Sequence, residues 1–332
     1  MFNVLNGSGK GRARALEHRR TFSTLDNPPE DTRLPFQLNK AVSLENQKKM
    51  GSTDWTMRAA QWDPTQQMAV VNIIPLPKPG PNQMLVKMAS ASLCHSDLMS
   101  INRPNLTDPS AIGHEGAGYV YQLAIAGFGD FGFFQEYAAV DLQDIIHLPE
   151  ALDPKKSSAI FCAGITAFHA VDACDLKKAQ WLAVVGAGGL GQLATQYAKA
   201  MGFQVISIDI NDNAPQACEE QGADFIINST SQANAYIGEV KNLTSGGVHA
   251  AAVFSAATVA YKGAPALIRP GGVLMVVGIP ADSLQASAMD LVIGNYRIRA
   301  ESTSIPQRMK KKQWISQPSI KFYPRWRYCK TA

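Results

Sequence analysis

Two kinds of hydrophobic pattern follow one another along the chain, and the change between them lies near Pro154. Before it, short apolar runs are separated by proline and glycine, which is typical of β-strands joined by turns. After it, short apolar runs alternate with stretches of helical periodicity. This second pattern predicts a doubly wound parallel sheet. We therefore expect an α/β protein in which a β-rich domain precedes that sheet.

The predicted strands can be placed by residue. The β-rich part begins with Met57–Trp62 and continues with strands at Val70–Ile74, Met84–Met88, Ala117–Tyr121 and Phe134–Val140. The second part has predicted strands at 181–185, 205–209, 225–227, 250–254 and 273–277. Pro270-Gly271-Gly272 is predicted to form the turn that leads into the last strand, and Gly278-Ile-Pro280 is predicted to end it.

A glycine-rich segment lies at the first strand of the second part. It consists of Gly186, Gly188, Gly189, Leu190 and Gly191 around Ala187, and it follows the apolar run Trp181–Val185. A helical stripe comes next, at Leu190, Leu193, Ala194, Tyr197, Ala198 and Met201. Glycines in such a turn allow close backbone approach, so that a pyrophosphate can rest on the N-terminus of the helix. The segment predicts a dinucleotide site.

Asp209 ends the next predicted strand, eighteen residues after Gly191. An acidic residue at this place accepts hydrogen bonds from the adenosine ribose, whereas NADP binders usually supply an arginine for the 2′-phosphate. The positions that follow, 210–213, contain no basic residue. The sequence therefore predicts NAD as the cofactor.

Candidate metal ligands lie before the glycine-rich segment. They are Cys94, followed by His95, Ser96 and Asp97; His114, followed by Glu115; and Cys162. Two thiolates and one imidazole are three protein ligands for tetrahedral zinc, with the fourth position left for water or substrate. A cysteine taken alone is more often a small buried apolar residue, and a single histidine is often only a polar core or surface residue. The residue types alone therefore do not decide whether these residues bind a metal.

The order of these motifs adds further information. Cys-His-Ser-Asp, Gly-His-Glu-Gly-Ala-Gly, Cys-Ala-Gly-Ile-Thr, the glycine turn, the strand-end aspartate and Val-Gly-Ile-Pro-Ala-Asp (277–282) follow one another along the chain. From Met57 to about Lys311, the chain closely resembles the zinc-dependent medium-chain alcohol dehydrogenases, particularly the fungal ones. The resemblance implies a GroES-like catalytic domain followed by a Rossmann domain, with the active site in the cleft between them.

The resemblance also implies roles for single residues. Cys94, His114 and Cys162 would bind one catalytic zinc ion, with Glu115 as the acidic residue beside it. The catalytic residues would be Ser96, which relays the substrate proton, Asp97, which orients His114, and His95, which faces the cofactor pyrophosphate. Val277 and Ile279 would join the glycine turn and Asp209 at the NAD site. The implied activity is the reversible oxidation of an alcohol to an aldehyde or ketone.

Three features depart from that family. Met99 occupies the position where the family commonly has a histidine that ends the proton relay. Only 119–132 separate the Gly-His-Glu motif from the next strand, without a cysteine, so we expect no structural-zinc lobe. After Lys311 the chain continues as a basic, aromatic tail without clear periodicity, where the family has a helix and strands. We therefore expect an incomplete catalytic domain and an impaired activity.

The charges are distributed unevenly along the chain. The formal net charge is +4, but residues 57–304 carry 14 basic and 21 acidic side chains. The positive charge thus lies in the two ends, whereas a nucleic-acid binder would carry it on the folded domain. We expect a small-molecule substrate and no nucleic acid as partner. Whether the chain also forms a homo-oligomer is left open.

The composition bounds the class of protein. Five widely spaced cysteines form no disulfide framework, and apolar stretches are too short to span a membrane. We expect a cytoplasmic protein, with a mitochondrial location as the alternative if residues 1–24 act as a presequence. The expected segments are an unstructured extension (1–56), the catalytic domain (57–153), the NAD-binding domain (154–298) and the basic tail (299–332).

Two alternatives to an NAD-dependent alcohol dehydrogenase stay open. One is a zinc-free, NADPH-dependent quinone or enoyl reductase of the same superfamily, against which the candidate zinc ligands and Asp209 argue. The other is an inactive remnant that still binds nucleotide.

Overall fold

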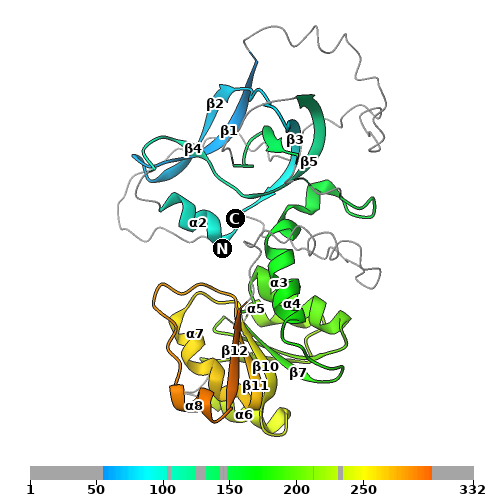
Figure 1. Cartoon of the computed structure of the whole chain (residues 1–332), viewed down its shortest axis with the longest axis vertical. Coiled ribbons are helices and arrows are strands. Elements are labelled where there is room, and N and C mark those ends of the chain that lie inside the picture. Colours follow the sequence, from blue (N-terminus) through cyan, green and yellow to red (C-terminus); the bar gives the residue numbers. More distant parts are fainter. Residues whose placement is uncertain are drawn as a thin grey trace. The chain divides into compact units, whose positions relative to one another are not determined.

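The structure is a computed structural model that describes residues 55–102, 106–124, 132–142, 145, 148–211, 213–230 and 235–300. The predicted extension at 1–56, except for its last two residues, and the tail after 300 lie outside these residues. The described chain has a β-rich part and a part built on one large sheet, coloured from blue to green and from green to orange in Figure 1. Each part is taken by itself below.

The β-rich part contains two three-stranded sheets. One has the order β2-β1-β4 and the other the order β5-β3-β6. The strands are β1 (Thr56–Asp63), β2 (Met68–Pro75), β3 (Gln83–Ser92), β4 (Ser110–Ala111), β5 (Glu115–Ala124) and β6 (Tyr137–Asp141). The five predicted strands of this part are present. Four of them are extended by one to four residues at each end, the fifth begins at Tyr137 rather than Phe134, and β4 was not predicted. The short helix α2 (His95–Ile101) follows β3 directly.

Two glycines of the Gly-His-Glu motif make room for the chain where it returns at Gly132. A Cβ on Gly113 would lie 2.2 Å from the Phe134 ring, and one on Gly116 would lie 2.7 Å from the Phe133 ring. The returning backbone is held there, because Phe133 N–H donates to the Gly113 carbonyl at 2.8 Å. These contacts explain why glycines flank His114 and Glu115 on both sides.

The second part is a six-stranded parallel sheet with the order β12-β11-β10-β7-β8-β9. Its strands are β7 (Trp181–Val185), β8 (Gln204–Asp209), β9 (Phe225–Asn228), β10 (Val248–Val253), β11 (Ile268–Val276) and β12 (Tyr296–Ala300). The doubly wound sheet predicted from the sequence is confirmed. The sequence analysis placed no strand at β12.

Helices accompany the strands of this sheet along the chain (Figure 1). They are α3 (Ala163–Asp172), α4 (Gly189–Ala200), α5 (Asn213–Glu220), α6 (Ala235–Leu243), α7 (Thr258–Gly263), η4 (Ala264–Leu267) and α8 (Ala288–Val292). Two short 3₁₀ helices, η2 (Pro154–Lys156) and η3 (Ser158–Phe161), contact β3 and β5 of the β-rich part instead. The predicted stripe of α4 is confirmed, since Leu193, Ala194, Tyr197 and Ala198 are buried. Within the described chain, no helix is both long and apolar enough to span a bilayer.

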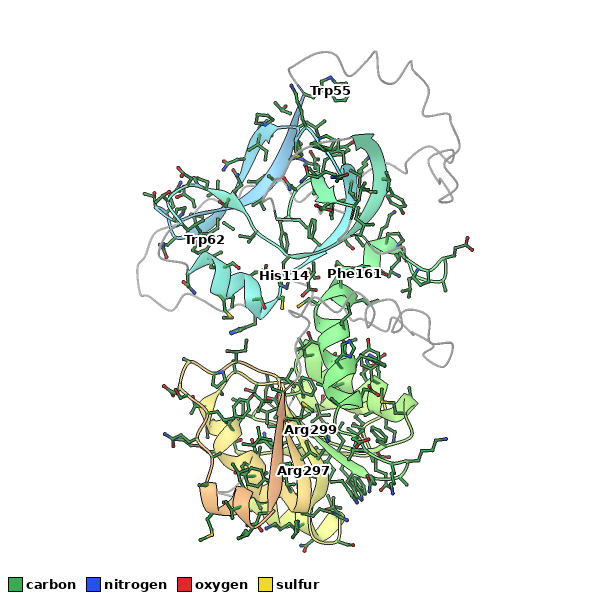
Figure 2. The ribbon with its side chains drawn as sticks, in the orientation of Figure 1. Trp55, Trp62, His114, Phe161, Arg297 and Arg299 are labelled. Atoms are coloured by element: carbon green, nitrogen blue, oxygen red, sulfur yellow. The ribbon has the colours of Figure 1, made fainter. Side chains whose placement is uncertain are left out.

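The prediction of a turn at Pro270-Gly271-Gly272 is wrong in one respect. These residues lie inside β11, where the pairing with β10 shifts from Val248–Ile268 to Ala250–Val273. The extra residues of β11 bulge out of the ladder, and Gly271 has a φ of 77°. Proline and glycine thus mark an irregularity within the strand rather than its beginning. On the neighbouring β12, Arg297 and Arg299 are labelled in Figure 2.

Candidate active site

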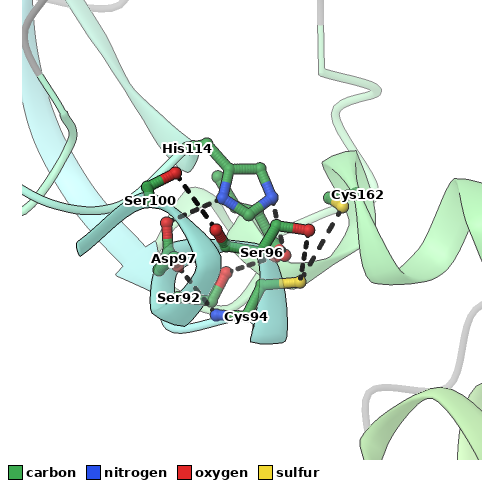
Figure 3. A network of polar contacts seen from close by, with 8 residues as sticks. Ser92, Cys94, Ser96, Asp97, Ser100, His114 and Cys162 are labelled. Atoms are coloured by element: carbon green, nitrogen blue, oxygen red, sulfur yellow. Dashed lines mark hydrogen bonds and ion pairs between the residues drawn. The ribbon is translucent and has the colours of Figure 1, made fainter. Parts of the chain in front are cut away.

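The start of α2 is held by the carboxylate of Asp97. Asp97 Oδ2 accepts a hydrogen bond from the backbone N–H of Cys94 at 2.8 Å, and Cys94 is the N-cap residue of the helix. Asp97 Oδ1 accepts a second hydrogen bond, from His114 Nδ1, at 2.8 Å. Asp97 is 3% exposed. One buried carboxylate therefore fixes both the backbone of Cys94 and the orientation of the His114 ring (Figure 3).

Four side chains bring one ligand atom each to a common place. Their ligand atoms lie within 4.8 Å of one another, and the residues are Cys94, His114, Glu115 and Cys162. Cys94 precedes α2, His114 and Glu115 lie at the start of β5, and Cys162 lies between η3 and α3. All four were predicted as metal residues. Residues far apart in sequence thus form one cluster.

The cluster fits a zinc ion on three counts. The two sulfur atoms are 4.0 Å apart, close to the edge of about 3.8 Å that two Zn–S bonds of about 2.3 Å span in a tetrahedron. His114 uses Nδ1 for Asp97, which leaves Nε2 for a metal. Glu115 Oε1 is buried and has no hydrogen-bond partner in the described chain, and an orphaned buried oxygen suits a cation.

The groups of the cluster shift one another's proton affinities. The hydrogen bond from Cys162, together with His114, lowers the pKa of Cys94 to about 3, and Cys94 in turn raises the pKa of Cys162. The hydrogen bond to Asp97 raises the pKa of His114 to about 10. Burial raises the pKa of Glu115 to about 8. Since metal ligands bind without their protons, metal binding at this cluster is coupled to proton release.

The predicted catalytic residues lie on the first turn of α2. Ser96 is exposed, and its Oγ lies 4.0 Å from Cys94 Sγ. His95, the first residue of the helix, is also exposed. Met99 is 49% exposed and lies on the same helix as Ser96, where its thioether cannot take up a proton. The cluster and Ser96 thus form one local site, whereas Met99 adds no titratable group.

One residue that touches this cluster was missed by the sequence analysis. Ser92 Oγ donates a hydrogen bond to Glu115 Oε2 at 2.6 Å. The signal that could have found it is the pairing of β3 with β5, which places Ser92 directly opposite Glu115. That register is not visible in the sequence pattern.

The glycine turn lies where the strand order of the large sheet changes direction. Gly186 follows β7, has a φ of 98°, and would place a Cβ 2.9 Å from the backbone nitrogen of Ser255, which follows β10. A Cβ on Gly191 would lie 2.0 Å from the Gly186 carbonyl oxygen, so this glycine lets α4 pack on the turn. Ligands of open parallel sheets bind at such a switch point.

Gly188 and Gly189 differ from these two glycines, because a Cβ on either would meet no atom within 4 Å. Gly188 is the N-cap of α4, and no side chain caps the helix. Both glycines are exposed, so no side chain of their own covers the start of α4, as a phosphate bound at a helix N-terminus requires. Leu190 is half-buried on α4, and Val277 and Ile279 follow the carboxyl end of β11.

Asp209 supports the turn itself. Its Oδ2 accepts from Ala187 N–H at 2.7 Å, and its Oδ1 accepts from the N–H groups of Ile210 and Asn211 at 2.7 and 3.1 Å. A carboxylate accepts about four hydrogen bonds. Asp209 thus braces the glycine turn and keeps about one acceptor position for a ligand, a double role that the sequence analysis did not predict.

A six-stranded parallel sheet with a glycine turn at its switch point, together with a β-rich part that carries a Cys–His–Glu–Cys cluster, defines the class of medium-chain dehydrogenases and reductases. The comparisons with known families agree. The model for the alcohol dehydrogenase GroES-like domain matches residues 80–126, and the model for zinc-binding dehydrogenases matches residues 189–313. The chain belongs to the zinc-type medium-chain alcohol dehydrogenase family.

Individual proteins of this kind are similar over most of their length. An alcohol dehydrogenase of Rhizobium meliloti (strain 1021) is 28% identical over 288 residues, which is 74% of this chain and 83% of the relative. A putative zinc-binding dehydrogenase of Sinorhizobium meliloti 1021, bound to NADP, is 19% identical with a TM-score of 0.68 and covers 81% of this chain and 91% of its own.

An acetophenone reductase of Geotrichum candidum, in complex with NAD, is 20% identical with a TM-score of 0.66 and covers 80% of this chain and 87% of its own. These two structures support the fold. The family models and the curated alcohol dehydrogenase relatives support an oxidoreductase of the medium-chain superfamily. The predicted fold class and the zinc-type medium-chain alcohol dehydrogenase family are confirmed, whereas the fungal type and the missing structural-zinc lobe stay predictions.

Proposed function

We propose that the protein is a zinc- and NAD-dependent alcohol dehydrogenase that interconverts a primary or secondary alcohol and its aldehyde or ketone. The observation that carries this proposal is the cluster of Cys94, His114, Glu115 and Cys162. Asp97 accepts a hydrogen bond from His114 Nδ1, which leaves Nε2 for the metal. A quinone or enoyl reductase without zinc would have no use for this set of donor atoms.

One group of residues in the site would hold the metal, and Ser96 would transfer the proton. Cys94, His114 and Cys162 would hold zinc, with Glu115 beside it, and catalytic zinc sites take up to five ligands. When bound, zinc would supply a Lewis acid for the substrate oxygen, and NAD a hydride acceptor. Ser96 would accept the hydroxyl proton of the alcohol at Oγ and pass it to water, since Met99 offers no acceptor on α2.

The cofactor part of the proposal depends on Asp209. A carboxylate at the end of β8 repels a 2′-phosphate and can accept a hydrogen bond from a ribose hydroxyl. Because Asp209 also supports the glycine turn, Asp209→Ala should weaken the binding of both NADH and NADPH. The informative quantity is the ratio of the dissociation constants for NADPH and NADH. Measured by fluorescence on the full chain, that ratio should exceed one and should shrink in the variant.

The experiment that tests the activity combines metal analysis with a single turnover. Freshly purified full-length protein should contain zinc, and mixing it with NAD and a panel of primary and secondary alcohols should produce NADH. Folded protein without zinc that oxidises NADPH with a quinone or enoyl substrate would support the zinc-free reductase instead. Nucleotide binding without turnover on any substrate would support an inactive remnant.

A further inference from the structure

The carboxylate of Glu115 is unusual because it is almost completely buried and only half satisfied. Glu115 is 1% exposed. Its Oε2 accepts the hydrogen bond from Ser92 at 2.6 Å, whereas its Oε1 has no hydrogen-bond partner among the described residues. The closest ring nitrogen, His114 Nε2, lies 3.7 Å from Oε1. A buried carboxylate is costly unless its oxygens are paired, so Oε1 requires an explanation.

Ser92 reaches Glu115 because of the strand register. Ser92 ends β3, Glu115 begins β5, and the two residues are direct partners in the antiparallel pair. Side chains of directly opposed residues share one face of the sheet and lie close together. Since serine has one carbon between backbone and hydroxyl, the strand pair restricts Oγ to the few positions that the χ1 rotamers allow, and one of them meets Glu115 Oε2. The donor is therefore built into the sheet that carries the cluster.

We propose that Ser92 is a positioning residue of the metal site. By holding Glu115 Oε2, it keeps Oε1 turned toward the donor atoms of Cys94, His114 and Cys162, and so makes Glu115 a single-oxygen ligand. The inference rests on the proposed zinc site and adds a residue to it. Hydrogen-bond partners of metal ligands typically change metal affinity ~10–100-fold.

The test uses the full chain loaded with Zn²⁺ or Co²⁺. Ser92→Ala should raise the dissociation constant for Zn²⁺, measured against a chromophoric chelator, by about 10–100-fold. It should also change the visible absorption bands of bound Co²⁺, which report the ligand set. Ser92→Thr keeps the hydroxyl and should behave like the unmodified protein in both measurements.

A matched control lies two residues away on the same strand. Ser90 Oγ donates to the carbonyl of Pro154 at 2.5 Å and touches none of the four cluster residues. Ser90→Ala removes one serine hydrogen bond from β3 and should leave the metal affinity and the Co²⁺ bands unchanged. A general loosening of β3 would move both alanine variants together, and that result would overturn the inference.

A double-mutant comparison isolates the pair. In a Glu115→Ala background, Ser92→Ala should have no further effect on Zn²⁺ affinity, because its partner is gone. An undiminished effect there, or a Ser92→Ala protein with the affinity and Co²⁺ spectrum of the unmodified chain, would refute the role of Ser92 while leaving the zinc site intact. Unmodified, folded protein that binds neither metal would instead overturn the zinc site itself, and this inference with it.

Discussion

Asp97, on the first turn of α2, orients two other residues of the candidate site. Asp97 receives hydrogen bonds from the Cys94 backbone and from the His114 ring, one on each oxygen. Both partners are donors, so the position needs two acceptors. Those hydrogen bonds, acting against the effect of burial, lower the pKa of Asp97 and keep it charged.

Asp97→Asn should remove one of the two hydrogen bonds that position Cys94 and His114. An amide has one acceptor oxygen and one donor nitrogen, so one of the two donors would lose its partner. We expect Zn²⁺ affinity to fall by about 10–100-fold, measured by competition with a chelator. Asp63→Asn is the matched control, because Asp63 also accepts hydrogen bonds from backbone N–H groups, at Thr65 and Gln66, but lies outside the site. Equal Zn²⁺ affinity of the Asp97 and Asp63 variants would contradict this role.

Ser96→Ala should slow catalysis without removing metal. Ser96 Oγ lies beside Cys94 Sγ and is exposed, as a proton relay to water requires. General acid–base contributions are typically ~10²–10⁴-fold, so kcat for alcohol oxidation should fall within that range while zinc content stays constant. Ser100→Ala, which removes only a hydrogen bond to the Ser96 carbonyl, serves as the control. An oxidation rate that Ser96→Ala leaves unchanged would show that protons leave by another path.

At the scale of elements, the turn between β7 and α4 uses its glycines for two different purposes. Gly186 and Gly191 are required by close packing, since a Cβ on either would lie less than 3.0 Å from backbone atoms. Gly188 and Gly189 border open space. The first pair lets the turn form, and the second pair leaves the N-terminus of α4 accessible.

Alanine at Gly191 should therefore lower the stability of the protein, whereas alanine at Gly189 should weaken NADH binding. Gly191→Ala forces a methyl group into the Gly186 carbonyl and should cost about 1–3 kcal/mol of unfolding free energy, seen as a lower midpoint in urea. Gly189→Ala should keep that midpoint, or raise it slightly as alanine favours helix, but should weaken NADH binding by obstructing the phosphate position. If both variants unfold at the same urea concentration, the two purposes are not distinct.

At the scale of the whole molecule, the metal cluster and the nucleotide turn belong to different segments of the chain. Within the described residues, the four-residue cluster is the one group of side chains that could hold a metal ion. Cys174 and Cys218 are buried away from it, and burial raises the pKa of each thiol. The described residues thus offer one candidate metal site, and the glycine turn shares none of its residues.

Metal removal should consequently abolish turnover but spare cofactor binding. After treatment with a strong chelator, the full chain should lose at most one zinc per chain by elemental analysis, and NADH should still gain fluorescence on binding. Restoring Zn²⁺ should restore turnover. Two zinc ions per chain would contradict a single ligand set, and loss of NADH binding along with the metal would show that the nucleotide site depends on it.

Much of the fold could be predicted because its signals are local. Apolar runs mark β7, β8 and β10, the stripe on α4 marks a buried face, and the glycines between them mark a dinucleotide turn. The cluster of Cys94, His114, Glu115 and Cys162 was found by resemblance to a family, since no spacing rule joins residues so far apart. Strand β12 was missed, and Pro270-Gly271-Gly272 was misread, because pairing with β11 or β10 decides both.

The amino-acid order alone was enough for the kinds of element, the parallel sheet and the chemical types at the site, because hydrophobic period and turn chemistry act over a few residues. Contacts between distant atoms required the folded chain. The hydrogen bond of Ser92 to Glu115, that of His114 to Asp97 and the bracing of the glycine turn by Asp209 all depend on how separate elements pack together. Each of these hydrogen bonds joins two separate elements, and no local pattern along either element encodes it.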